Sequence, residues 1–416
     1  MSAAPGRSQA SSHRSAPNEG IPVCGATILP GSLQAGQQAT LGVLGGGQLG
    51  RMFVQAAQAM GYFTAVLDPD VTSPAGLISH YHIQTDYLDQ AGLAQLTQRC
   101  VAVTTEFENV PAGALQTLGA QRLVAPGADA VRIAQDRASE KAHFVRCGVA
   151  CAPYAVIDSM QALAAVDAAL LPGILKTTRL GYDGKGQIRV ATRAELQAAW
   201  DELKHVDCVL EKMLSLKAEC SVIVARGRDG VMVNLPVQRN QHRDGILAVT
   251  EVFDGVLPAA LCEQAIAATK AVAEQLQYVG VLCVEFFVLD DDSLVVNEMA
   301  PRPHNSGHYS LHACDQSQFE LQVRTLAGLP LTQPRQHSPA IMLNLLGELW
   351  LTRGAEPVTP PWAQVLALPG THLNLYGKLR ASKGRKMGHL TVTGASPEQV
   401  RTTAAEVAHL LGIAPG

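Results

Sequence analysis

Two glutamates, Glu285 and Glu298, interrupt apolar runs that are otherwise typical of buried β-strands. The runs are 279–289 and 294–300, and the stretch between them, Asp290–Ser293, has the composition of a turn. A hairpin whose turn is centred midway along that stretch makes the two glutamates direct partners on one face. Like charges placed opposite each other in a sheet repel, and burial raises the cost unless a cation compensates.

The facing carboxylates predict a divalent cation between them. Oxygen ligands of this kind suit magnesium, and magnesium beside carboxylates commonly accompanies nucleotide phosphates. Asn297 precedes Glu298 and adds an amide oxygen for the ion or for a phosphate. A simpler alternative stays open at this point, in which Glu285 pairs with Arg302 and Glu298 points to solvent after a shift in register.

The first part of the chain is predicted to form a doubly wound parallel sheet. Apolar runs over 39–44, 62–68 and 101–106 have the composition of strands, and a helix is predicted from about residue 49 to residue 60. Strands that alternate with helices in this way pack as a parallel sheet with helices on both faces.

A glycine-rich turn, Gly45-x-Gly47-x-x-Gly50, joins the first of these strands to the helix, and Asp68 ends the next strand. This spacing matches a dinucleotide-binding fingerprint, which makes an NAD-dependent oxidoreductase one alternative. The same turn can hold any anion or polar ligand at a helix N-terminus, and Gln48 adds a side-chain donor.

A second glycine-rich segment, Gly181–Gln187, is predicted to connect two short strands of a small mixed unit. Its three glycines let backbone N–H groups approach phosphates closely, and Lys185 adds positive charge. Lys176 lies on the preceding apolar strand and requires a negative partner, which favours a phosphate. Tyr182 is placed to cover the site if the loop moves. The alternative is an ordinary flexible turn.

The connector Glu211-Lys212-Met213-Leu214 follows a predicted strand and is a candidate nucleotide contact. Backbone groups of such a connector can contact the edge of adenine, and a downstream acid, here Glu219, can hold ribose hydroxyls. The spacing alone is not specific for a nucleotide.

The polar segment Pro301–His308 directly follows the acidic hairpin. His304, His308 and His312 are four residues apart, which on a helix would predict zinc. The prolines and the Asn-Ser-Gly run argue against a helix there. Recognition of a polar substrate beside the metal fits this segment better.

Five cations lie within nine residues between Lys378 and Lys386. A solvated turn is the simplest alternative, and a nucleic-acid patch is another. The chain has a formal net charge of −4, which gives no general reason to expect nucleic acid or a membrane surface. A phosphate group on a small substrate fits the cluster better.

The bulk composition is that of a multidomain globular protein. The 416 residues suffice for two to four domains, and 47% of them are hydrophobic. No apolar run approaches the ~20 residues that a membrane helix needs. The nine cysteines are scattered without a Cys-x-x-Cys pair, so we expect reduced thiols and a cytoplasmic location.

Taken together, these segments resemble the ATP-grasp superfamily and, within it, the 5-(carboxyamino)imidazole ribonucleotide synthase family of purine biosynthesis. The resemblance spans about residues 40–395. Its most specific motifs are, in chain order, 45–52 (GGGQLGRM), 105–110 (TEFENV), 181–187 (GYDGKGQ), 297–308 (NEMAPRPHNSGH) and 384–389 (GRKMGH).

The resemblance implies an α/β protein with the ATP-grasp fold. Residues 1–38, rich in Ser, Ala, Gly, Pro and Gln, are predicted to be a disordered extension. The expected units after it are a pre-ATP-grasp Rossmann-like domain with a doubly wound parallel sheet (39–145), a small mixed lid domain (146–215), a larger α+β catalytic domain with the acidic hairpin (216–345) and a small C-terminal subdomain (346–416).

The activity implied by the resemblance uses ATP, Mg²⁺ and bicarbonate. ATP phosphorylates bicarbonate to carboxyphosphate, and carbon dioxide released in the closed site is captured by the exocyclic amine of 5-aminoimidazole ribonucleotide. Other ATP-grasp ligases and carboxylases share the hairpin and remain alternatives. The expected partners are these small molecules and a second copy of the chain in a homodimer, not nucleic acid or a membrane.

The resemblance also assigns roles to individual residues. The predicted metal ligands are Glu285 and Glu298. The predicted catalytic residues are Arg302, His304 and Tyr182. The predicted ATP-binding residues are Arg137, Lys176, Gly181, Tyr182, Asp183, Gly184, Lys185, Gly186, Gln187, Glu211, Lys212, Met213, Leu214, Glu219, His242, Asn297 and Glu298. The residues predicted to bind the ribonucleotide and bicarbonate are Gln48, Leu49, Glu106, Arg302, His304, Asn305, Ser306, Lys378 and Arg385.

Overall fold

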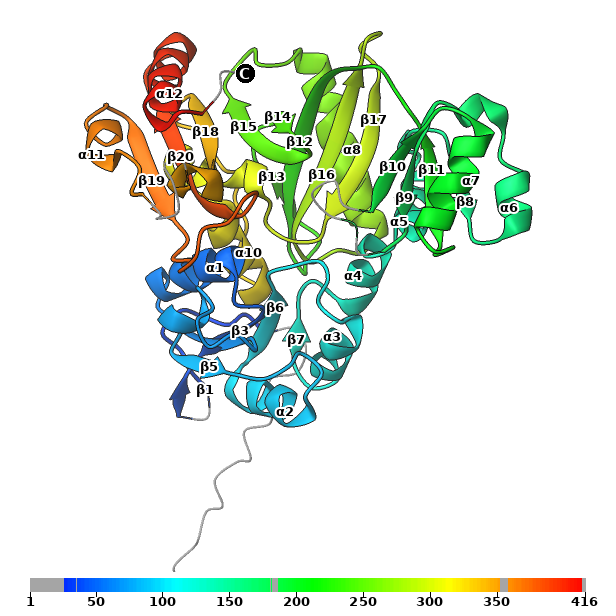
Figure 1. Cartoon of the computed structure of the whole chain (residues 1–416). Helices are drawn as coiled ribbons and strands as arrows, with labels where there is room; N and C mark the ends of the chain where they lie inside the picture. The colour runs from blue at the N-terminus through cyan, green and yellow to red at the C-terminus, as the bar shows by residue number, and fades with distance from the viewer. Residues whose placement is uncertain (1–25, 35, 180, 182–185, 352–357, 414–416) are drawn as a thin grey trace, which may run out of the picture.

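The computed structural model describes residues 26–34, 36–179, 181, 186–351 and 358–413. These residues form an N-terminal parallel sheet, a small four-stranded sheet and a large antiparallel sheet, with a two-stranded hairpin at the start (Figure 1). Among the described helices, none combines the length and apolar character needed to cross a membrane.

The N-terminal sheet is parallel and has the strand order β5-β4-β3-β6-β7, which confirms the predicted doubly wound arrangement. The chain runs outward from β3 to β5 on one side and from β6 to β7 on the other. The carboxyl ends of β3 and β6 therefore border the switch point where ligands bind in such sheets. The strands are β3 (Thr40–Leu44), β4 (Phe63–Leu67), β5 (Tyr81–Ile83), β6 (Ala102–Thr105) and β7 (Leu123–Val124).

One of the helices that pack in this region comes from much later in the chain. α10 (Gln318–Ala327) buries Val323 and Leu326 in the same core as Phe53 of α1 (Gln48–Ala59), so the N-terminal domain and the large sheet share a helix. The other helical segments here are η1 (Gly76–Ile78), α2 (Gln90–Arg99), α3 (Ala112–Gly119), α4 (Ala128–Ala134) and α5 (Arg137–Arg146).

The described part of the predicted disordered extension is ordered, so that prediction is wrong from residue 26 onward. Ile28 is only 6% exposed and belongs to the N-terminal core. Its N–H donates to the carbonyl of Ala327 at 2.8 Å, and its carbonyl accepts from the hydroxyl of Tyr62 at 2.6 Å. One buried isoleucine fixes a segment whose composition is otherwise that of a tail. The hairpin strands β1 (Leu33–Gln34) and β2 (Gln37–Gln38) follow it.

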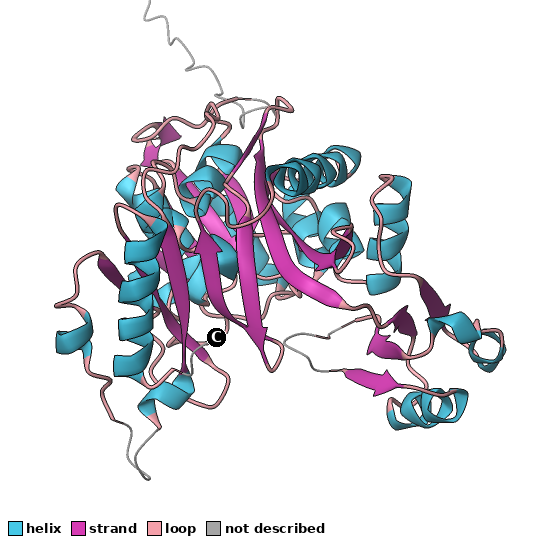
Figure 2. Ribbon diagram, turned by 90° about the horizontal axis from the view of Figure 1, so that it is seen from above, coloured by secondary structure: helices cyan, strands magenta, loops and turns pink. Residues whose placement is uncertain are grey.

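The small sheet is antiparallel, has the order β10-β9-β11-β8, and lies apart from the large sheet (Figure 2). Gln187 pairs with Lys176, which confirms that the second glycine-rich segment connects two strands of a hairpin. The elements are β8 (Tyr154–Ile157), α6 (Met160–Ala164), η2 (Ala168–Leu170), β9 (Gly173–Thr177), β10 (Gln187–Val190), α7 (Arg193–Glu202) and β11 (Cys208–Lys212).

The large sheet has the order β17-β16-β12-β14-β15-β18-β20-β19, with β13 paired to β12. Alternate residues of its strands face two different cores: Val222 packs toward α8 (Ala259–Gln275), whereas Ile223 packs toward α10. The strands are β12 (Leu216–Arg226), β13 (Met232–Asn234), β14 (Gln238–Arg243), β15 (Ile246–Val252), β16 (Gly280–Leu289), β17 (Leu294–Ala300), β18 (Ala340–Leu346), β19 (Thr371–Leu375) and β20 (Lys386–Thr393).

The C-terminal residues extend this sheet instead of building a separate one. β18 pairs with β15 on one side and with β20 on the other, so the predicted boundary between 345 and 346 cuts through the end of a shared strand. Ser396 caps α12 (Pro397–Leu411) by accepting from the N–H of Gln399. The remaining helical segments are η3 (Asn305–Gly307), α9 (Ser310–Ala313), η4 (Gly347–Trp350) and α11 (Trp362–Val365).

We expect Ile28→Ala to lower the free energy of unfolding by about 2 kcal/mol, because it leaves a cavity in the N-terminal core. The neighbouring change Leu29→Ala is the control, since that side chain is 59% exposed and its loss should cost less than about 0.5 kcal/mol. Urea unfolding followed by circular dichroism compares the two variants. Equal, small effects would contradict the buried position of Ile28.

Candidate active site

The acidic hairpin forms as predicted, with Glu285 of β16 directly opposite Glu298 of β17. The pairing depends on a β-bulge at Asn297. Nearer the turn, Phe286 pairs with Val296. If this register continued without interruption, Asn297 would lie opposite Glu285. The bulge skips Asn297 and brings Glu298 into position. The two carboxylates are therefore neighbours because of a local irregularity that the sequence pattern does not show.

Each of the two glutamates has a basic partner. Nε2 of His304 lies 2.8 Å from Oε1 of Glu285, and a guanidinium nitrogen of Arg137 lies 3.2 Å from Oε2 of Glu298. Burial raises the pKa of Glu285, but the charge and hydrogen bond of His304 outweigh burial and hold that pKa below its usual range. The alternative Glu285–Arg302 pair does not form, because Arg302 pairs with Glu108.

A third carboxyl group, that of Glu140, lies beside the hairpin. It is buried, and its Oε1 accepts from the N–H of Met299 at 2.7 Å. Burial, together with the charge of Glu298, raises the pKa of Glu140 to about 8. The shift disfavours a third negative charge beside the hairpin.

The oxygen donors around the hairpin fit a magnesium ion. Two carboxylates and the amide oxygen of Asn297 are hard ligands, and the side chain of Glu298 is 44% exposed and reachable from solvent. A ring N–H of His304 and the guanidinium of Arg137 already contact these carboxylates. The residues therefore fit a magnesium site but do not require one, and an ion binding there would replace these two partners.

A buried polar network orients His304. Its Nδ1 accepts from the backbone N–H of Ser306 at 3.3 Å and lies 2.9 Å from the Ser306 hydroxyl, which leaves Nε2–H to donate to Glu285. The Ser306 hydroxyl is 2.8 Å from that of Ser221, which in turn accepts from the amide of Asn240 at 2.8 Å. Ser306, predicted to bind substrate, has no exposed surface and orients His304 instead.

Asn305 lies next to this network and is itself buried. Neither its amide nitrogen nor its amide oxygen has a hydrogen-bond partner among the described residues. Burying an unpaired amide costs free energy. The orphaned amide favours the predicted contact of Asn305 with a polar ligand.

Lys176 has the negative partner that its buried position requires, but that partner belongs to the protein. Its Nζ lies 3.0 Å from one carboxylate oxygen of Glu211, and Nζ of Lys141 lies 3.2 Å from the other. Glu211 is buried with both oxygens engaged, so its predicted contact with adenosine is not supported by this structure. The three groups carry one net positive charge, which a phosphate can balance.

The predicted connector begins within β11, whose last residue is Lys212, and part of its backbone is hydrogen-bonded within the protein. The N–H groups of Lys212 and Met213 donate to the carbonyls of Pro153 and Pro172 at 2.9 and 3.0 Å. These two amides are therefore already paired, which leaves their carbonyls and the groups of Leu214 for the predicted contact with adenine.

Glu219 and His242, both predicted to lie near the nucleotide, are brought together by β12 and β14. Nδ1 of His242 lies 2.6 Å from a carboxylate oxygen of Glu219. Burial lowers the pKa of His242, but its hydrogen bond to Glu219 and the charge of Glu285 outweigh burial and raise that pKa. The pair therefore lies within electrostatic reach of the acidic hairpin.

Arg137 contacts two hairpins. One is the acidic hairpin, and the other is the hairpin of β9 and β10 in the predicted lid domain, called the lid hairpin below. Besides its pair with Glu298, it donates to the carbonyl of Gly181 at 3.3 Å. Gly186 and Gln187 lie at the other end of this connection, where Gln187 is exposed. The predicted ligands Tyr182, Asp183, Gly184 and Lys185 lie outside the described residues.

The first glycine turn is filled by carboxylates. Glu106 accepts from the N–H groups of Gly47 and Gly50 at 2.7 and 3.0 Å, and Asp68 accepts from Gly46 at 2.7 Å. These acids occupy the helix N-terminus where a dinucleotide fold binds pyrophosphate, and they would repel one. The geometry therefore argues against the NAD alternative.

Gln48 and Leu49, predicted to contact the ribonucleotide, open α1 beside this turn. Gln48 is partly exposed, whereas Leu49 is 8% exposed and packs in a small cluster with Phe319 and Tyr376. The side chain of Leu49 supports the turn, and Gln48 has the accessible polar group.

The predicted phosphate-binding cations come from the loop before β20. Nζ of Lys378 donates to the carbonyl of Lys386 at 2.7 Å, and Arg385 is exposed and donates to the carbonyl of Arg380 at 2.6 Å. Burial, with the nearby charge of Arg385, lowers the pKa of Lys378 to about 8. Lys378 and Glu106 also interact electrostatically, which places this loop beside the first glycine turn.

The three histidines considered as zinc ligands do not converge. The ring of His308 lies 4.7 Å from that of His389, and the ring of His312 stacks on His372 at 4.4 Å. Only His304 faces the acidic hairpin.

Several residues of the site had no role predicted from the sequence. Glu108 lies two residues beyond Glu106 in the 105–110 motif, so its position after β6 was a usable signal. Cys283 lies two residues before Glu285 and so shares its sheet face. Glu140 and Lys141 gave no signal, because adjacent charged residues in a helix usually indicate a solvated face.

Comparison with known families agrees with this architecture. Residues 38–135 match the ribonucleotide synthetase pre-ATP-grasp domain, residues 142–319 the ATP-grasp domain, and residues 340–403 the phosphoribosylaminoimidazole carboxylase C-terminal domain. The C-terminal match begins at β18, consistent with that strand's place in the extended sheet.

A relative from Brucella melitensis biotype 1, an N5-carboxyaminoimidazole ribonucleotide synthase, is 42% identical over 359 residues, covering 85% of this chain and 95% of the relative. The chain belongs to the N5-carboxyaminoimidazole ribonucleotide synthase family. This is the family, under an equivalent chemical name, that the sequence motifs resemble, and ATP-grasp is its superfamily.

Solved structures of this family superpose on the chain. The Staphylococcus aureus N5-carboxyaminoimidazole synthetase with ADP is 36% identical, with a TM-score of 0.81. The match covers 90% of this chain and 97% of the S. aureus chain. The Aspergillus clavatus N5-carboxyaminoimidazole synthase with ADP and 5-aminoimidazole ribonucleotide is 30% identical, with a TM-score of 0.81. The match covers 90% of this chain and 99% of the A. clavatus chain.

We expect Glu211→Gln to lower the free energy of unfolding by about 3 kcal/mol, because it leaves Lys141 and Lys176 buried without a countercharge. Glu202→Gln, an exposed position on α7 of the same sheet unit, is the matched control and should have little effect. Chemical unfolding of both variants measures the difference. Equal stabilities would show that the buried lysines do not depend on Glu211.

Proposed function

We propose that this protein catalyses the ATP- and bicarbonate-dependent carboxylation of the exocyclic amine of 5-aminoimidazole ribonucleotide, with ADP and phosphate as the other products. The observation that carries the proposal is the facing pair Glu285 and Glu298. Family members of the same fold are known with ADP, and one with 5-aminoimidazole ribonucleotide as well. We assign the same ligands to this chain.

We place the ATP phosphates between the lid hairpin and the acidic hairpin. Arg137 contacts both of these elements, and the Lys141–Glu211–Lys176 cluster provides net positive charge beside them. Phosphoryl transfer depends mainly on positioned charge, which these groups supply. Glu285 and Glu298 would hold a magnesium ion with Asn297 beside them, and that ion would neutralise charge on the phosphates.

We place bicarbonate and the ribonucleotide on the side of Arg302 and His304. His304 is fixed by Ser306 with its Nε2–H toward Glu285, and if a cation engaged Glu285 this N–H would be free to orient a reactant oxygen. Arg302 supplies a permanent positive charge for bicarbonate or its phosphorylated form. Carboxyphosphate is short-lived in water, so closure of the lid over the site is part of the proposal.

We assign the ribonucleotide phosphate to Lys378 and Arg385. Both lie on a loop that approaches the first glycine turn, and Gln48 is the accessible donor of that turn. The turn therefore serves a ribonucleotide, with Glu106 holding its backbone in shape.

A homodimer and a cytoplasmic location remain predictions from the resemblance and from the cysteine content. Sedimentation of the purified chain tests the first, and a fluorescent fusion in the producing cell tests the second.

The direct test is release of phosphate from ATP in the presence of 5-aminoimidazole ribonucleotide and bicarbonate. We expect Glu298→Gln to reduce kcat at least about 100-fold, because the amide no longer supplies a charge to the ion at the phosphates. Asp292→Asn, in the exposed turn of the same hairpin, is the control and should retain activity. Full activity of the Glu298 variant would contradict the assignment, and ATP binding without phosphate release would indicate a nucleotide-sensing module.

The pH dependence of substrate binding tests the role of Lys378. This lysine is charged below its pKa of about 8 and loses its charge as pH rises through that value. A substrate phosphate is a dianion above about pH 6. We therefore expect the KM for the ribonucleotide to be lowest between these values and to rise above pH 8. In Lys378→Arg, which stays charged, that rise should disappear, and a rise that persists would exclude Lys378 as its cause.

A further inference from the structure

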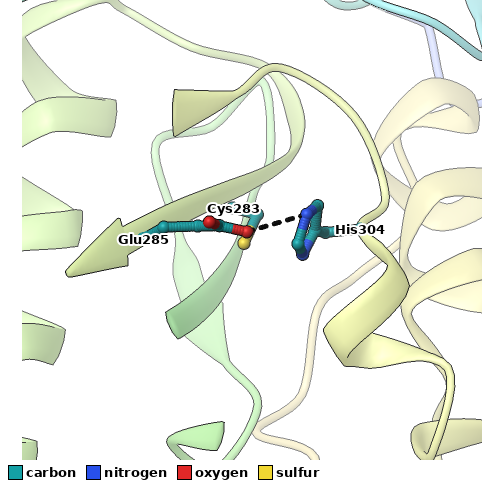
Figure 3. A group of neighbouring side chains, drawn as sticks. All are labelled: Cys283, Glu285 and His304. Atoms are coloured by element: carbon teal, nitrogen blue, oxygen red, sulfur yellow. Dashed lines mark ion pairs between the residues drawn. The ribbon is translucent and has the colours of Figure 1, made fainter. Parts of the chain in front are cut away.

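A thiol lies beside the proposed catalytic groups without any part in the proposed reaction. Sγ of Cys283, a carboxylate oxygen of Glu285 and a ring nitrogen of His304 all lie within 4.8 Å of one another. Figure 3 shows the thiol and the carboxylate side by side and facing the imidazole ring. Cys283 and Glu285 are alternate residues of β16 and therefore share a face of the sheet.

The three side chains have the chemistry of a transition-metal site. Thiolate, imidazole and carboxylate together suit Zn²⁺, whereas magnesium takes oxygen ligands almost exclusively. A tetrahedral zinc ion holds such ligand atoms about 3.4–3.6 Å apart. The distance between Nε2 of His304 and Oε1 of Glu285 is 2.8 Å and must increase slightly when the ion binds. The thiol lies within 4.8 Å of both atoms and must move to its own ligand distance from the ion.

We propose that Cys283, Glu285 and His304 bind Zn²⁺ or a chemically similar transition-metal ion, and that the bound ion blocks the reaction. The ligands are Sγ, one oxygen of Glu285 and Nε2 of His304, with water in the fourth position. The thiol releases its proton to solvent, and no group is oxidised or reduced. The imidazole proton moves from Nε2 to Nδ1, and Nδ1–H then donates a hydrogen bond to the hydroxyl oxygen of Ser306, 2.9 Å away, in place of the bond that Nδ1 accepts from the Ser306 N–H.

The surroundings permit entry and charge balance. Cys283 has no exposed surface, but the side chains of Glu285 and His304 are 11% and 15% exposed, so the ion enters from their side. The thiolate and the carboxylate balance a divalent ion. The nearby guanidinium of Arg302 is paired with Glu108, which reduces its repulsion of a cation.

The binding of the ion stands on the geometry alone, whereas its inhibitory effect rests on the proposed function. Glu285 is the proposed magnesium ligand and His304 a proposed catalytic residue, so an ion that engages both removes them from the reaction. Magnesium cannot replace it on the thiol. Cys283 thereby makes the site sensitive to a class of metal that the reaction itself does not use.

Binding is tested with Co²⁺ as a spectroscopic probe of the full chain. We expect one equivalent to bind with a thiolate-to-cobalt charge-transfer band. In Cys283→Ala that band should be lost and the affinity should fall at least about tenfold, since even loss of a residue that only supports a ligand costs 10- to 100-fold. Cys220→Ala is the matched control, because Cys220 is equally buried in the adjacent strand but faces the core under α8.

A second variant, Cys283→Ser, covers the case in which Cys283→Ala does not fold, since its oxygen gives no such band. Absence of the band in the wild-type chain would overturn the proposal. A band that persists equally in both Cys283 variants would also overturn it, because the thiol would then belong to another cysteine.

Inhibition is tested in the phosphate-release assay with added Zn²⁺ and reversal by a chelator. We expect Cys283→Ala to keep the basal rate and to need at least about tenfold more Zn²⁺ for half-inhibition than the wild type or Cys220→Ala. Equal inhibition of all three would overturn the proposal while leaving the proposed function intact. A chain that binds Co²⁺ through Cys283 but shows no ribonucleotide-dependent phosphate release would refute the proposed function and leave the metal site standing.

Discussion

The repulsion between two facing carboxylates is the constraint on which this site depends. Glu285 and Glu298 are cross-strand partners, so two carboxylates that repel each other lie side by side on one face of the hairpin, and Glu285 is buried there. A ring N–H of His304 contacts Glu285, and the guanidinium of Arg137 contacts Glu298. In the proposed function, a magnesium ion bound to these carboxylates would replace both contacts.

This exchange connects elements that are far apart in the chain. His304 is held by a buried network that reaches Ser221 in β12 and Asn240 in β14, whereas Arg137 also contacts Gly181 at the lid hairpin. In the proposed function, release of Arg137 from Glu298 would free it for the phosphates, and release of His304 would free its N–H toward the substrate side. One pair of acids would thus link the binding of nucleotide and metal to the preparation of the second substrate.

The sequence predicted the fold class and the hairpin well because both depend on local patterns. Turn composition predicted Glu285 opposite Glu298, but the pairs next to the turn are offset by one residue and the bulge restores this pairing. Glycine spacing located both loops. The β-bulge, the order of Ile28 and the continuity of the large sheet through β18 were not predictable, because each depends on contacts between distant segments. The same limit explains Glu211, whose burial between two lysines is a tertiary property.

The most direct measurement is a crystal structure of the protein with Mg²⁺ and a non-hydrolysable ATP analogue. It should show carboxylate oxygens of both Glu285 and Glu298 about 2.0–2.1 Å from magnesium, with Arg137 turned to the phosphates and His304 released from Glu285. A structure in which the nucleotide is bound, both ion pairs persist and the magnesium contacts neither glutamate would contradict the account.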